Sequence, residues 1–507
     1  MTSFSQFLQT FVPALEKKST QLNKASWILE TTGLDDACDL KAALDTELRM
    51  LFQDKETYEK LLSWSVDDPI LKRQQNVLIR AFKQNQVEKS LLEELATKEA
   101  HIAQSFAGFR PILDGKSCSE NDIRDILKKE ENVQLRKSAW EASKEIGKVL
   151  APQILALVDL RNKIARSLGY SDYFQMQLDL QEVDGAWLLE TFDTLAKGSD
   201  AAYSTVIEEI EKRQKEPGPW SWIEPFCQED PLDTKELDTL VEGVDITQAA
   251  TEFFKKMGFD VRDILAKSDM EERLGKNQHA FCINIDRKKD VRTLNNVKPT
   301  LKWLETVLHE LGHAVYELGF NEKLPWLLRE PPHMIPTEAM ALLAGRQAYR
   351  PASLKELVGK KDELLFKKAE SSLKRRQLIF SRWVLVMTAF ESELYKNPHQ
   401  DLNGLWWHLV QKYQKITPPQ GREGKFDWAT KYHIGLAPVY YFSYLVGEML
   451  ASSIQEALST KTLAEPTAGA FLTKKLFFPG NSLPWNKLAE EVTGGPLTPD
   501  GWLKEFA

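Results

Sequence analysis

The stretch His309-Glu310-Leu311-Gly312-His313 constrains the fold of this chain more than any other feature of its sequence. Two histidines four residues apart can bind one metal ion where the segment is helical, because that spacing places both rings on one helix face. The flanking residues 302–318 contain no proline, and their apolar side chains recur at helical spacing. Gly312 costs a helix about 1 kcal/mol relative to alanine, which indicates close packing against a neighbouring element. The pattern is typical of zinc hydrolases, in which Glu310 would accept a proton from the attacking water.

A catalytic zinc site normally has three protein ligands, so a third ligand is expected downstream. Residues 330–345 offer His333 and Glu338 as candidates. Pro336 stands near a predicted helix start with Thr337 as a possible N-cap, and Glu338 opens a helical run rich in Ala, Leu and Met. A helix holds a ligand more rigidly than a proline-flanked loop does, which favours Glu338 over His333. The alternative for Glu338 is a first-turn carboxylate that complements the helix dipole.

The composition indicates one large globular unit. The 507 residues contain no Gly/Ser-rich linker, and the best candidate break, residues 215–220, is typical of a turn between helical blocks. We therefore expect a single domain over residues 1–507, with a first part at 1–215 and a metal-bearing part at 216–507. An apolar content of 42% with 28% charged residues is ordinary for a soluble protein. The net charge of −8 argues against nucleic acid and anionic membranes as partners, and no stretch approaches the roughly 20 apolar residues of a membrane span.

Cysteine usage predicts a reducing compartment. The four cysteines are widely spaced and form no C-x-x-C pair, so reduced thiols are a simpler interpretation than a disulfide framework. The first residues lack a basic segment followed by a long apolar run, so no signal peptide is visible. We expect a cytoplasmic protein; a mature secreted chain that has lost its leader is the alternative.

Long helical patterns dominate the chain and predict a mainly α fold. They are rich in Leu, Glu, Lys and Ala, which have high helix propensity. These patterns cover residues 47–62, 88–107, 132–167, 189–213, 355–396 and 405–415. The best strand candidates are residues 278–286 and 291–294, which flank a polar turn. They predict one small hairpin just before the metal helix, and its edge could align an extended peptide through backbone hydrogen bonds.

A second group of chemistry-bearing residues lies at 426–442. Metal-assisted hydrolysis of a peptide needs donors for the oxyanion of the tetrahedral intermediate, and often a cation for a terminal carboxylate. Lys431, His433 and Tyr441 are of the right types. Their spacing alone is weak evidence, because the tyrosines around residue 441 could equally form an aromatic core stripe.

Several separated motifs in this order resemble the peptidyl-dipeptidase A (angiotensin-converting enzyme) family of zinc metallopeptidases. The motifs are His309–His313, Leu324–Glu330 leading to Glu338, Pro398–Trp407, Lys412–Pro419 and Phe426–Phe442. The likeness is strong over residues 278–458 and fainter upstream. It implies an almost wholly α-helical fold, in which two halves flank a deep central cleft and a helical lid lies near the N-terminus.

The resemblance implies a role for each residue of the metal centre. His309, His313 and Glu338 would hold one Zn²⁺ per chain, and Glu310 would act first as general base and then as general acid. Four residues after the third ligand the family usually has an aspartate that supports a metal-binding histidine, but this chain has Leu342. Loss of such support can cost about 10- to 100-fold in metal affinity or activity, so another group must replace it or zinc is held less tightly.

The resemblance also assigns the substrate-binding residues. His433 and Tyr441 would stabilise the tetrahedral intermediate, with Tyr441 donating to the oxyanion. Lys431 would bind the C-terminal carboxylate of the substrate. His279 and Ala280 match a His-Ala pair on an edge strand that lines the primed subsites of the family.

The chain departs from the family at several further positions. Val410 and Tyr440 stand where the family has its two chloride-site arginines, so chloride dependence is not expected. Gln278 and about Asn296 replace two cysteines that brace the edge-strand region. The loop around His433 to Tyr441 is about two residues shorter than in the family, which leaves Tyr440 as a minor rival to Tyr441. Gln228 is a candidate for the family's carboxylate-binding glutamine.

The sequence thus predicts a monomeric zinc peptidyl-dipeptidase that removes dipeptides from the C-terminus of short peptides. If Lys431 lies one residue rather than two beyond the scissile bond, the enzyme would release single amino acids, and an oligopeptidase with another cleavage register is a related alternative. A third hypothesis is an inactive homologue that binds peptides without cleaving them. It is less favoured because each catalytic position is present.

Overall fold

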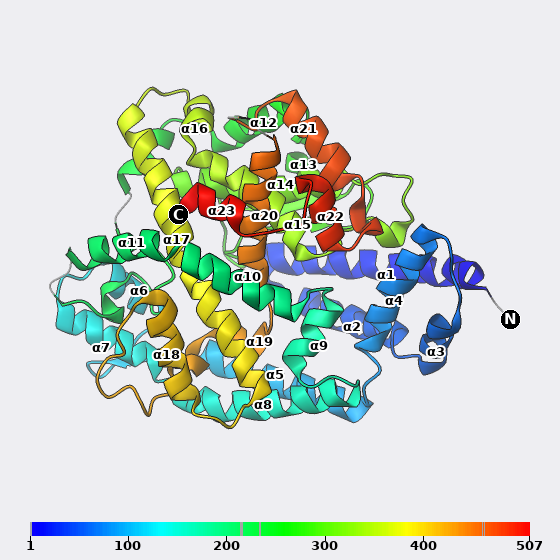
Figure 1. Cartoon of the computed structure of the whole chain (residues 1–507), viewed down its shortest axis with the longest axis horizontal. Helices are drawn as coiled ribbons and strands as arrows, with labels where there is room; N and C mark the ends of the chain where they lie inside the picture. Colours follow the sequence, from blue (N-terminus) through cyan, green and yellow to red (C-terminus); the bar gives the residue numbers. More distant parts are fainter. Residues whose placement is uncertain (1–2, 213–215, 233–234, 459, 461) are drawn as a thin grey trace. The chain divides into compact units, whose positions relative to one another are not determined.

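The computed structural model describes residues 3–212, 216–232, 235–458, 460 and 462–507 (Figure 1). Helices dominate the described residues, which confirms the predicted mainly α fold, and the sheets among them are two small antiparallel hairpins. The chain divides into two compact units. Unit 1 comprises Met1–Gln86, Thr234–Ser372 and Val446–Gly501, and unit 2 comprises Val87–Asp233, Leu373–Leu445 and Trp502–Ala507. The division expected between residues 215 and 216 is not one of these boundaries, and Lys215 lies outside the described residues.

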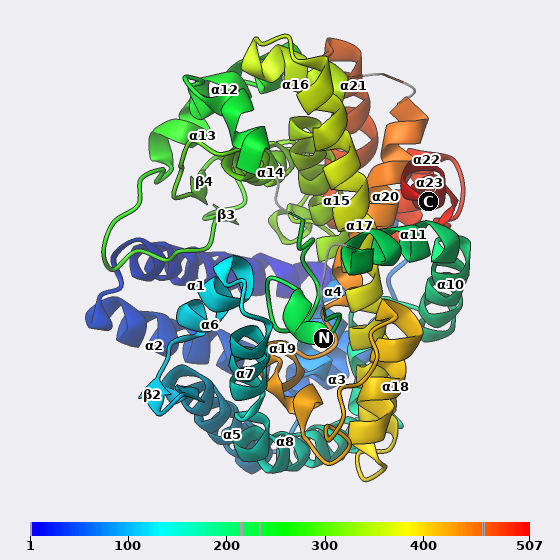
Figure 2. The ribbon, with the colours of Figure 1, turned by 90° about the vertical axis from the view of Figure 1, so that its left-hand side faces the viewer.

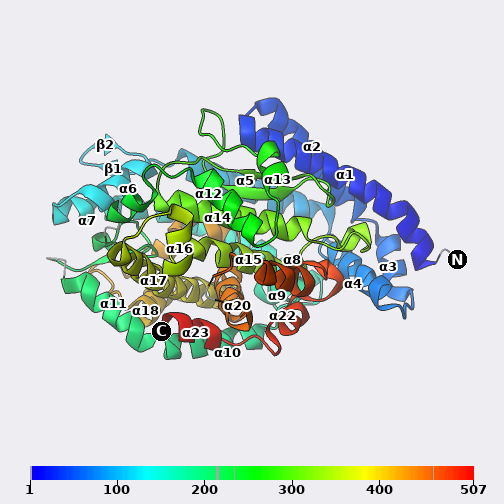
Figure 3. The same ribbon diagram turned by 90° about the horizontal axis from the view of Figure 1, so that it is seen from above.

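Unit 1 is built from helices at both ends of the chain and in its middle. Its α-helices are α1 (Phe4–Thr32), α2 (Asp35–Leu51), α3 (Lys55–Ser63), α4 (Pro69–Lys83), α12 (Ile246–Lys256), α13 (Arg262–Lys267), α14 (Leu301–Leu318), α15 (Met334–Gly345), α16 (Pro351–Val358), α21 (Pro466–Leu472) and α22 (Trp485–Thr493). Short helical turns are η2 (Lys235–Val241), η3 (Trp326–Leu328), η4 (Arg346–Ala348), η6 (Thr473–Phe477) and η7 (Gly480–Ser482). Within this unit α1 and α2 pack side by side (Figure 3).

Unit 2 is also mainly helical. Its elements are α5 (Lys89–Gly108), β1 (Ile112–Leu113), β2 (Lys116–Ser117), α6 (Glu120–Lys129), α7 (Val133–Lys144), α8 (Gly147–Ser167), α9 (Tyr173–Leu180), α10 (Gly185–Gly198), α11 (Asp200–Lys212), η1 (Pro219–Ser221), α18 (Leu402–Gln414), η5 (Asp427–Thr430) and α19 (Tyr432–Leu436). Three helices, α17 (Glu363–Lys396), α20 (Phe442–Leu458) and α23 (Asp500–Phe506), have residues in both units. None of the described helices combines the length and the apolar character needed to cross a membrane.

Helix caps explain why several of the long helical patterns form two helices each. The pattern at 47–62 is interrupted because the side chain of Asp54 accepts a hydrogen bond from the backbone N–H of Thr57 and starts α3. The pattern at 355–396 is interrupted at Gly359, whose left-handed conformation (φ 65°) ends α16. Both signals are single residues inside segments of otherwise high helix propensity.

The predicted hairpin is present as β3 (Phe281–Asn284) and β4 (Val291–Leu294), and it packs on α14 (Figure 2). Phe281 pairs with Leu294 in its antiparallel register. Trp27 of α1 packs edge-on against Phe281, with ring centroids 6.2 Å apart, and joins a small core with the hairpin. The strand was expected to begin at residue 278. It begins after His279 and Ala280 instead, because the side chain of Asn277 accepts a hydrogen bond from the N–H of His279 in a tight turn.

Candidate metal centre

The helix α14 positions His309, His313 and Glu310, and its bounds confirm the helix predicted over 302–318. Thr300 caps its start by accepting a hydrogen bond from the backbone N–H of Trp303. The apolar face of α14 is buried in unit 1, whereas the two histidines are half-buried. Their rings lie on one helix face with centroids 4.9 Å apart. The four-residue spacing therefore places both imidazole rings on the same face of α14, which it can do only in a helix.

Gly312 allows α15 to approach α14 closely. A Cβ atom at Gly312 would lie 2.8 Å from Cα of Ala341 and 3.2 Å from the carbonyl oxygen of Met340, which is closer than side chains tolerate. The close packing inferred from this glycine is confirmed, and the partner is α15. The same contact brings the first turns of α15, with Glu338, towards the two histidines.

Glu338 completes a group of three potential metal ligands. Its Oε2 lies 3.8 Å from Nε2 of His309, and its Oε1 lies 3.9 Å from Nε2 of His313. One donor atom from each of the three residues lies within 4.8 Å of the others. These separations allow one ion to contact all three donors, and two imidazoles with one carboxylate are a ligand set of catalytic zinc sites.

His333, the rival third ligand, has a different place in the structure. It is the N-cap of α15, and its Nδ1 accepts a hydrogen bond of 3.0 Å from the backbone N–H of Ile335. The cap expected at Thr337 is therefore four residues too late. Pro336 lies in the first turn of α15, where its missing N–H costs no intrahelical hydrogen bond.

Thr337 has a role that the sequence did not reveal. Its hydroxyl oxygen lies 2.7 Å from Nδ1 of His313. With the ring proton on Nδ1, this contact is a hydrogen bond from His313 to Thr337, and it leaves the Nε2 lone pair on the side of Glu338; orienting a metal-binding histidine in this way is the usual function of an outer partner. Leu342, where the resemblance predicts a supporting aspartate, is half-buried, and its Cδ1 would lie 3.5 Å from a Cβ atom added at Gly447. The position of Thr337 directly before Glu338 is the only sequence signal for this contact.

The electrostatics of the three residues and Glu310 fit a cation-binding site. Burial raises the pKa of Glu338 to about 7, aided by the charge of Glu448, and raises the pKa of Glu310 to about 8, aided by Glu338. Burial also lowers the pKa of His309 to about 4 and that of His313 well below its ordinary value. A divalent cation would reverse the carboxylate shifts, because it stabilises their ionised forms and uses the neutral form of each imidazole. The residues present therefore fit a zinc ion.

In unit 2, Lys431 is buried at the end of η5. Its Nζ lies 4.6 Å from the ring centroid of Phe226, 5.3 Å from that of Trp383 and 5.7 Å from that of Tyr441. Its Nζ donates no hydrogen bond to another described residue. Burial lowers the pKa of Lys431 to about 8, while the nearby charge of Glu224 opposes this shift. A buried ammonium ion without a hydrogen-bonded partner suits an anionic group of a ligand.

Gln228 binds Glu224, whose charge also acts on Lys431. Its backbone N–H and its side-chain Nε2 both donate to the carboxylate of Glu224, over 2.6 Å and 3.4 Å. The side chain of Gln228 is thus occupied by an internal contact, and a role in binding substrate stays a hypothesis.

His433 and Tyr441 lie against one another in unit 2, with ring centroids 4.7 Å apart. The neighbouring Tyr440 packs on Tyr444 instead, with centroids 5.3 Å apart. Burial lowers the pKa of His433 to about 4 and raises the pKa of Tyr441 well above its ordinary value. His433 is therefore neutral and Tyr441 protonated near pH 7, so both can donate a hydrogen bond. The buried Nδ1 of His433 has no hydrogen-bond partner among the described residues.

Comparison with known proteins decides the family. The model that describes peptidase family M3 matches residues 126–507. The chain belongs to peptidase family M3. A second model, described as angiotensin-converting enzyme, matches residues 2–206 of this M3 chain. The resemblance found in the sequence is confirmed.

Known proteins similar to this M3 peptidase are angiotensin-converting enzymes and a related protein. The enzyme of Theromyzon tessulatum is 21% identical over 429 residues, which cover 74% of the chain and 68% of that protein. The enzyme of Rattus norvegicus is 24% identical over 284 residues, covering 51% of the chain and 21% of that protein. Angiotensin-converting enzyme-like protein Ace3 of Mus musculus is 24% identical over 441 residues, covering 75% of the chain and 58% of that protein. The matched region is therefore only part of each relative.

Membership of peptidase family M3 makes the chain a metallopeptidase by family and makes zinc the ion implied for His309, His313 and Glu338.

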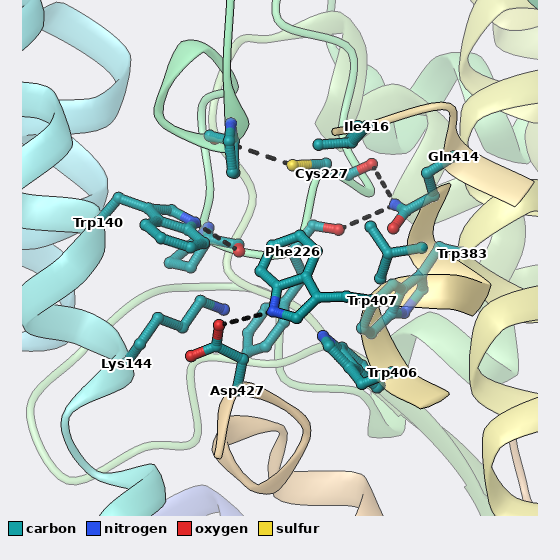
Figure 4. A pocket seen from close by; sticks show the side chains of 13 residues that line it. Trp140, Lys144, Phe226, Cys227, Trp383, Trp406, Trp407, Gln414, Ile416 and Asp427 are labelled. Atoms are coloured by element: carbon teal, nitrogen blue, oxygen red, sulfur yellow. Dashed lines mark hydrogen bonds between the residues drawn. The ribbon is translucent and has the colours of Figure 1, made fainter. Parts of the chain in front are cut away.

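Unit 2 contains a cavity lined by aromatic side chains, which bears on the expected lack of chloride dependence (Figure 4). Lys144 projects into it, and its Nζ lies 3.8 Å from the ring centroid of Phe226. Val410, where the resemblance predicts a chloride-site arginine, also lines the cavity.

Proposed function

We propose that this M3 peptidase is a zinc peptidyl-dipeptidase that shortens peptides from their C-terminus. The convergence of His309, His313 and Glu338 beside the buried carboxyl group of Glu310 carries the proposal. The likeness of the chain to angiotensin-converting enzymes supports the choice of a C-terminal dipeptide over other cleavage registers.

His309, His313 and Glu338 would hold the zinc ion. When bound, the ion supplies Lewis-acid chemistry, which lowers the pKa of the attacking water and polarises the scissile carbonyl. Glu310 directly follows His309 in α14 and its side chain is buried, and this is the position from which the glutamate of an H-E-x-x-H site acts as general base. We assign Glu310 the removal of a proton from the attacking water and the return of that proton to the leaving amine.

Tyr441 and His433 are proposed to stabilise the oxyanion that develops on the scissile carbonyl. The raised pKa of Tyr441 keeps its hydroxyl group protonated, so it donates rather than accepts a hydrogen bond. The lowered pKa of His433 keeps one N–H on a neutral ring. Donors fixed by burial need little reorganisation as charge develops, which is the main source of their catalytic effect.

Lys431 is proposed to bind the free C-terminal carboxylate of the substrate, and its burial makes this interaction strong because water screens it poorly. His279 and Ala280 are proposed to align the peptide backbone. If Lys431 contacts the residue directly after the scissile bond, the products would be single amino acids. That carboxypeptidase is the second candidate function.

Zinc content and the kinetics of Glu310→Gln test whether the protein is an enzyme. The wild type should contain one zinc ion per chain and cleave a peptide library, whereas Glu310→Gln should retain zinc and lose nearly all activity. An equally low activity of both proteins at full zinc content would favour the inactive peptide-binding homologue. We further propose that the protein is cytoplasmic, which the four unpaired cysteines support. We also propose that it is a monomer, which gel filtration with light scattering tests.

A further inference from the structure

The segment that carries His433 and Tyr441 contains a backbone conformation that needs support. Val439 has a φ of 55° and its side chain is 1% exposed. A β-branched residue rarely adopts this left-handed conformation, because its side chain collides with its own backbone. Such residues persist only where the surrounding structure holds them in place, and they are found preferentially near functional groups.

The support for Val439 comes from Glu391 of α17. The carboxylate oxygen Oε1 of Glu391 accepts a hydrogen bond of 2.9 Å from the backbone N–H of Val439, and the Glu391 side chain is 2% exposed. Gln181 donates a longer bond of 3.3 Å to the carbonyl oxygen of Val439. The N–H contact thus holds Val439 from one side and the carbonyl contact from the other.

A second buried contact holds the start of the same segment. Arg161, which is 1% exposed, donates a hydrogen bond of 2.8 Å to the carbonyl oxygen of Gly435 in α19. The charge of Arg161 also acts on Glu391. Burial of an ionisable group is costly unless the group has partners. Glu391 has the N–H of Val439, and Arg161 has the carbonyl group of Gly435 together with the side chains of Tyr395 and Glu99. His433 precedes these two anchors and Tyr441 follows them.

We propose that Glu391 is a positioning residue, which holds Val439 in its left-handed conformation and thereby sets where the Tyr441 hydroxyl group lies relative to His433. Tyr441 follows Val439 by two residues, so a change of φ at Val439 rotates the chain that carries the phenol ring. The proposal rests on the proposed role of Tyr441 in catalysis. Glu391 contacts the backbone of Val439 and would act on Tyr441 through it.

A double-mutant cycle between Glu391→Ala and Tyr441→Phe tests the proposal. Tyr441→Phe should lower kcat by about 10²- to 10³-fold through loss of one oxyanion donor. Glu391→Ala should lower kcat by about 10- to 100-fold through misplacement of that donor, with little change in KM. In the Tyr441→Phe background, Glu391→Ala should cost almost nothing further, since the group that it positions is gone. An undiminished cost there would overturn the proposal.

Two further variants separate positioning from general damage to the fold. Glu391→Gln keeps an acceptor oxygen for the N–H of Val439 and should retain nearly wild-type kcat even if Glu391→Ala folds poorly. Val439→Gly adopts a positive φ without strain, so adding it to Glu391→Ala should restore part of the lost kcat. Loss of activity in Glu391→Gln equal to that in Glu391→Ala, or no recovery with Val439→Gly in a folded protein, would contradict the proposal.

Hydrogen exchange of the Val439 amide keeps the test independent of the proposed function. If Tyr441→Phe retains full kcat, the catalytic role of Tyr441 fails, and the exchange rate alone decides the role of Glu391. The amide should be protected in the wild type and in Glu391→Gln, and it should exchange much faster in Glu391→Ala. An amide equally protected in all three proteins would show that Glu391 does not hold Val439.

Discussion

The hydroxyl oxygen of Thr337 lies 2.7 Å from Nδ1 of His313. Thr337 and His313 lie where α14 packs on α15, and the same packing places Glu338 beside the two histidines. One helix contact therefore positions the potential ligand Glu338 and also supports the potential ligand His313. This arrangement supplies an outer partner for His313 in a chain that has Leu342 where the resemblance predicts a supporting aspartate. A hydroxyl group is a weaker partner than a carboxylate, since it carries no charge to stabilise the polarised imidazole.

Replacing Thr337 by valine removes this partner while keeping the size and shape of the side chain. We expect zinc affinity to fall by about 10- to 100-fold, because His313 loses the contact that fixes its ring orientation. Thr337→Ser retains the hydroxyl group and serves as the matched control. Competition with a chromophoric chelator measures both affinities, and wild-type affinity in Thr337→Val would show that another group orients His313.

Gly312→Ala should separate α14 from α15. The added Cβ would lie 2.8 Å from Cα of Ala341, and overpacking of this kind costs about 1–3 kcal/mol of unfolding free energy. Zinc affinity should fall as well, because Glu338 moves with α15. Gly108→Ala is the control, since no atom lies within 4 Å of the position that its Cβ would occupy. Urea denaturation and zinc titration of both variants check the result.

The metal-free protein should lose stability as the pH rises from about 6.5 to about 8. Glu310 keeps its proton up to pH about 8 in the folded chain but releases it near 4.5 when unfolded. The folded state therefore binds more protons in this window, and the free energy of unfolding falls with rising pH. The lowered pKa values of His309 and His313 make the free energy of unfolding rise with pH, but only below about pH 6.5, where the unfolded histidines bind protons.

Melting temperatures of the chelator-treated protein across this pH range measure the effect. The fall should be smaller in Glu310→Gln, which carries no titrating group at that position, and smaller with zinc bound, because the cation stabilises the ionised carboxylates. An equal slope in all three samples would mean that other groups cause it.

Activity should respond little to chloride. Val410 brings no positive charge to the aromatic cavity, and the charge of Asp427 acts on Lys144, the basic residue among those that line it. A chloride ion would therefore meet Lys144 and, beside the lining, Arg422, whose guanidinium group is already paired with Asp427. Rates measured with chloride replacing acetate at constant ionic strength check this expectation, and a strong rise in rate would contradict it.

The sequence predicted those parts of the site that depend on local spacing. His309 and His313 share a helix face because they are four residues apart, and Gly312 indicated a close neighbour because glycine is unfavourable in a helix. Glu338 was preferred to His333 from helix rigidity alone. Each of these inferences needs only the geometry of one helix.

The parts that the sequence did not reveal depend on packing between distant segments. The contact of Glu391 with Val439 joins residues 48 positions apart in the chain, and nothing near Val439 indicates a positive φ. The start of β3 was placed too early because the turn at Asn277 outweighs the strand propensity of the residues that follow. The boundaries of the two units depend on packing as well, because the chain enters each unit more than once.

The products released from a blocked peptide test the central claim most directly. An N-acetylated hexapeptide with a free C-terminus, followed by mass spectrometry, should give the acetylated tetrapeptide and a dipeptide as the first products. The same peptide with an amidated C-terminus should be a poor substrate, and Lys431→Met should cleave both forms equally poorly. Release of single residues, or cleavage that ignores amidation, would contradict a peptidyl-dipeptidase in which Lys431 recognises the C-terminus.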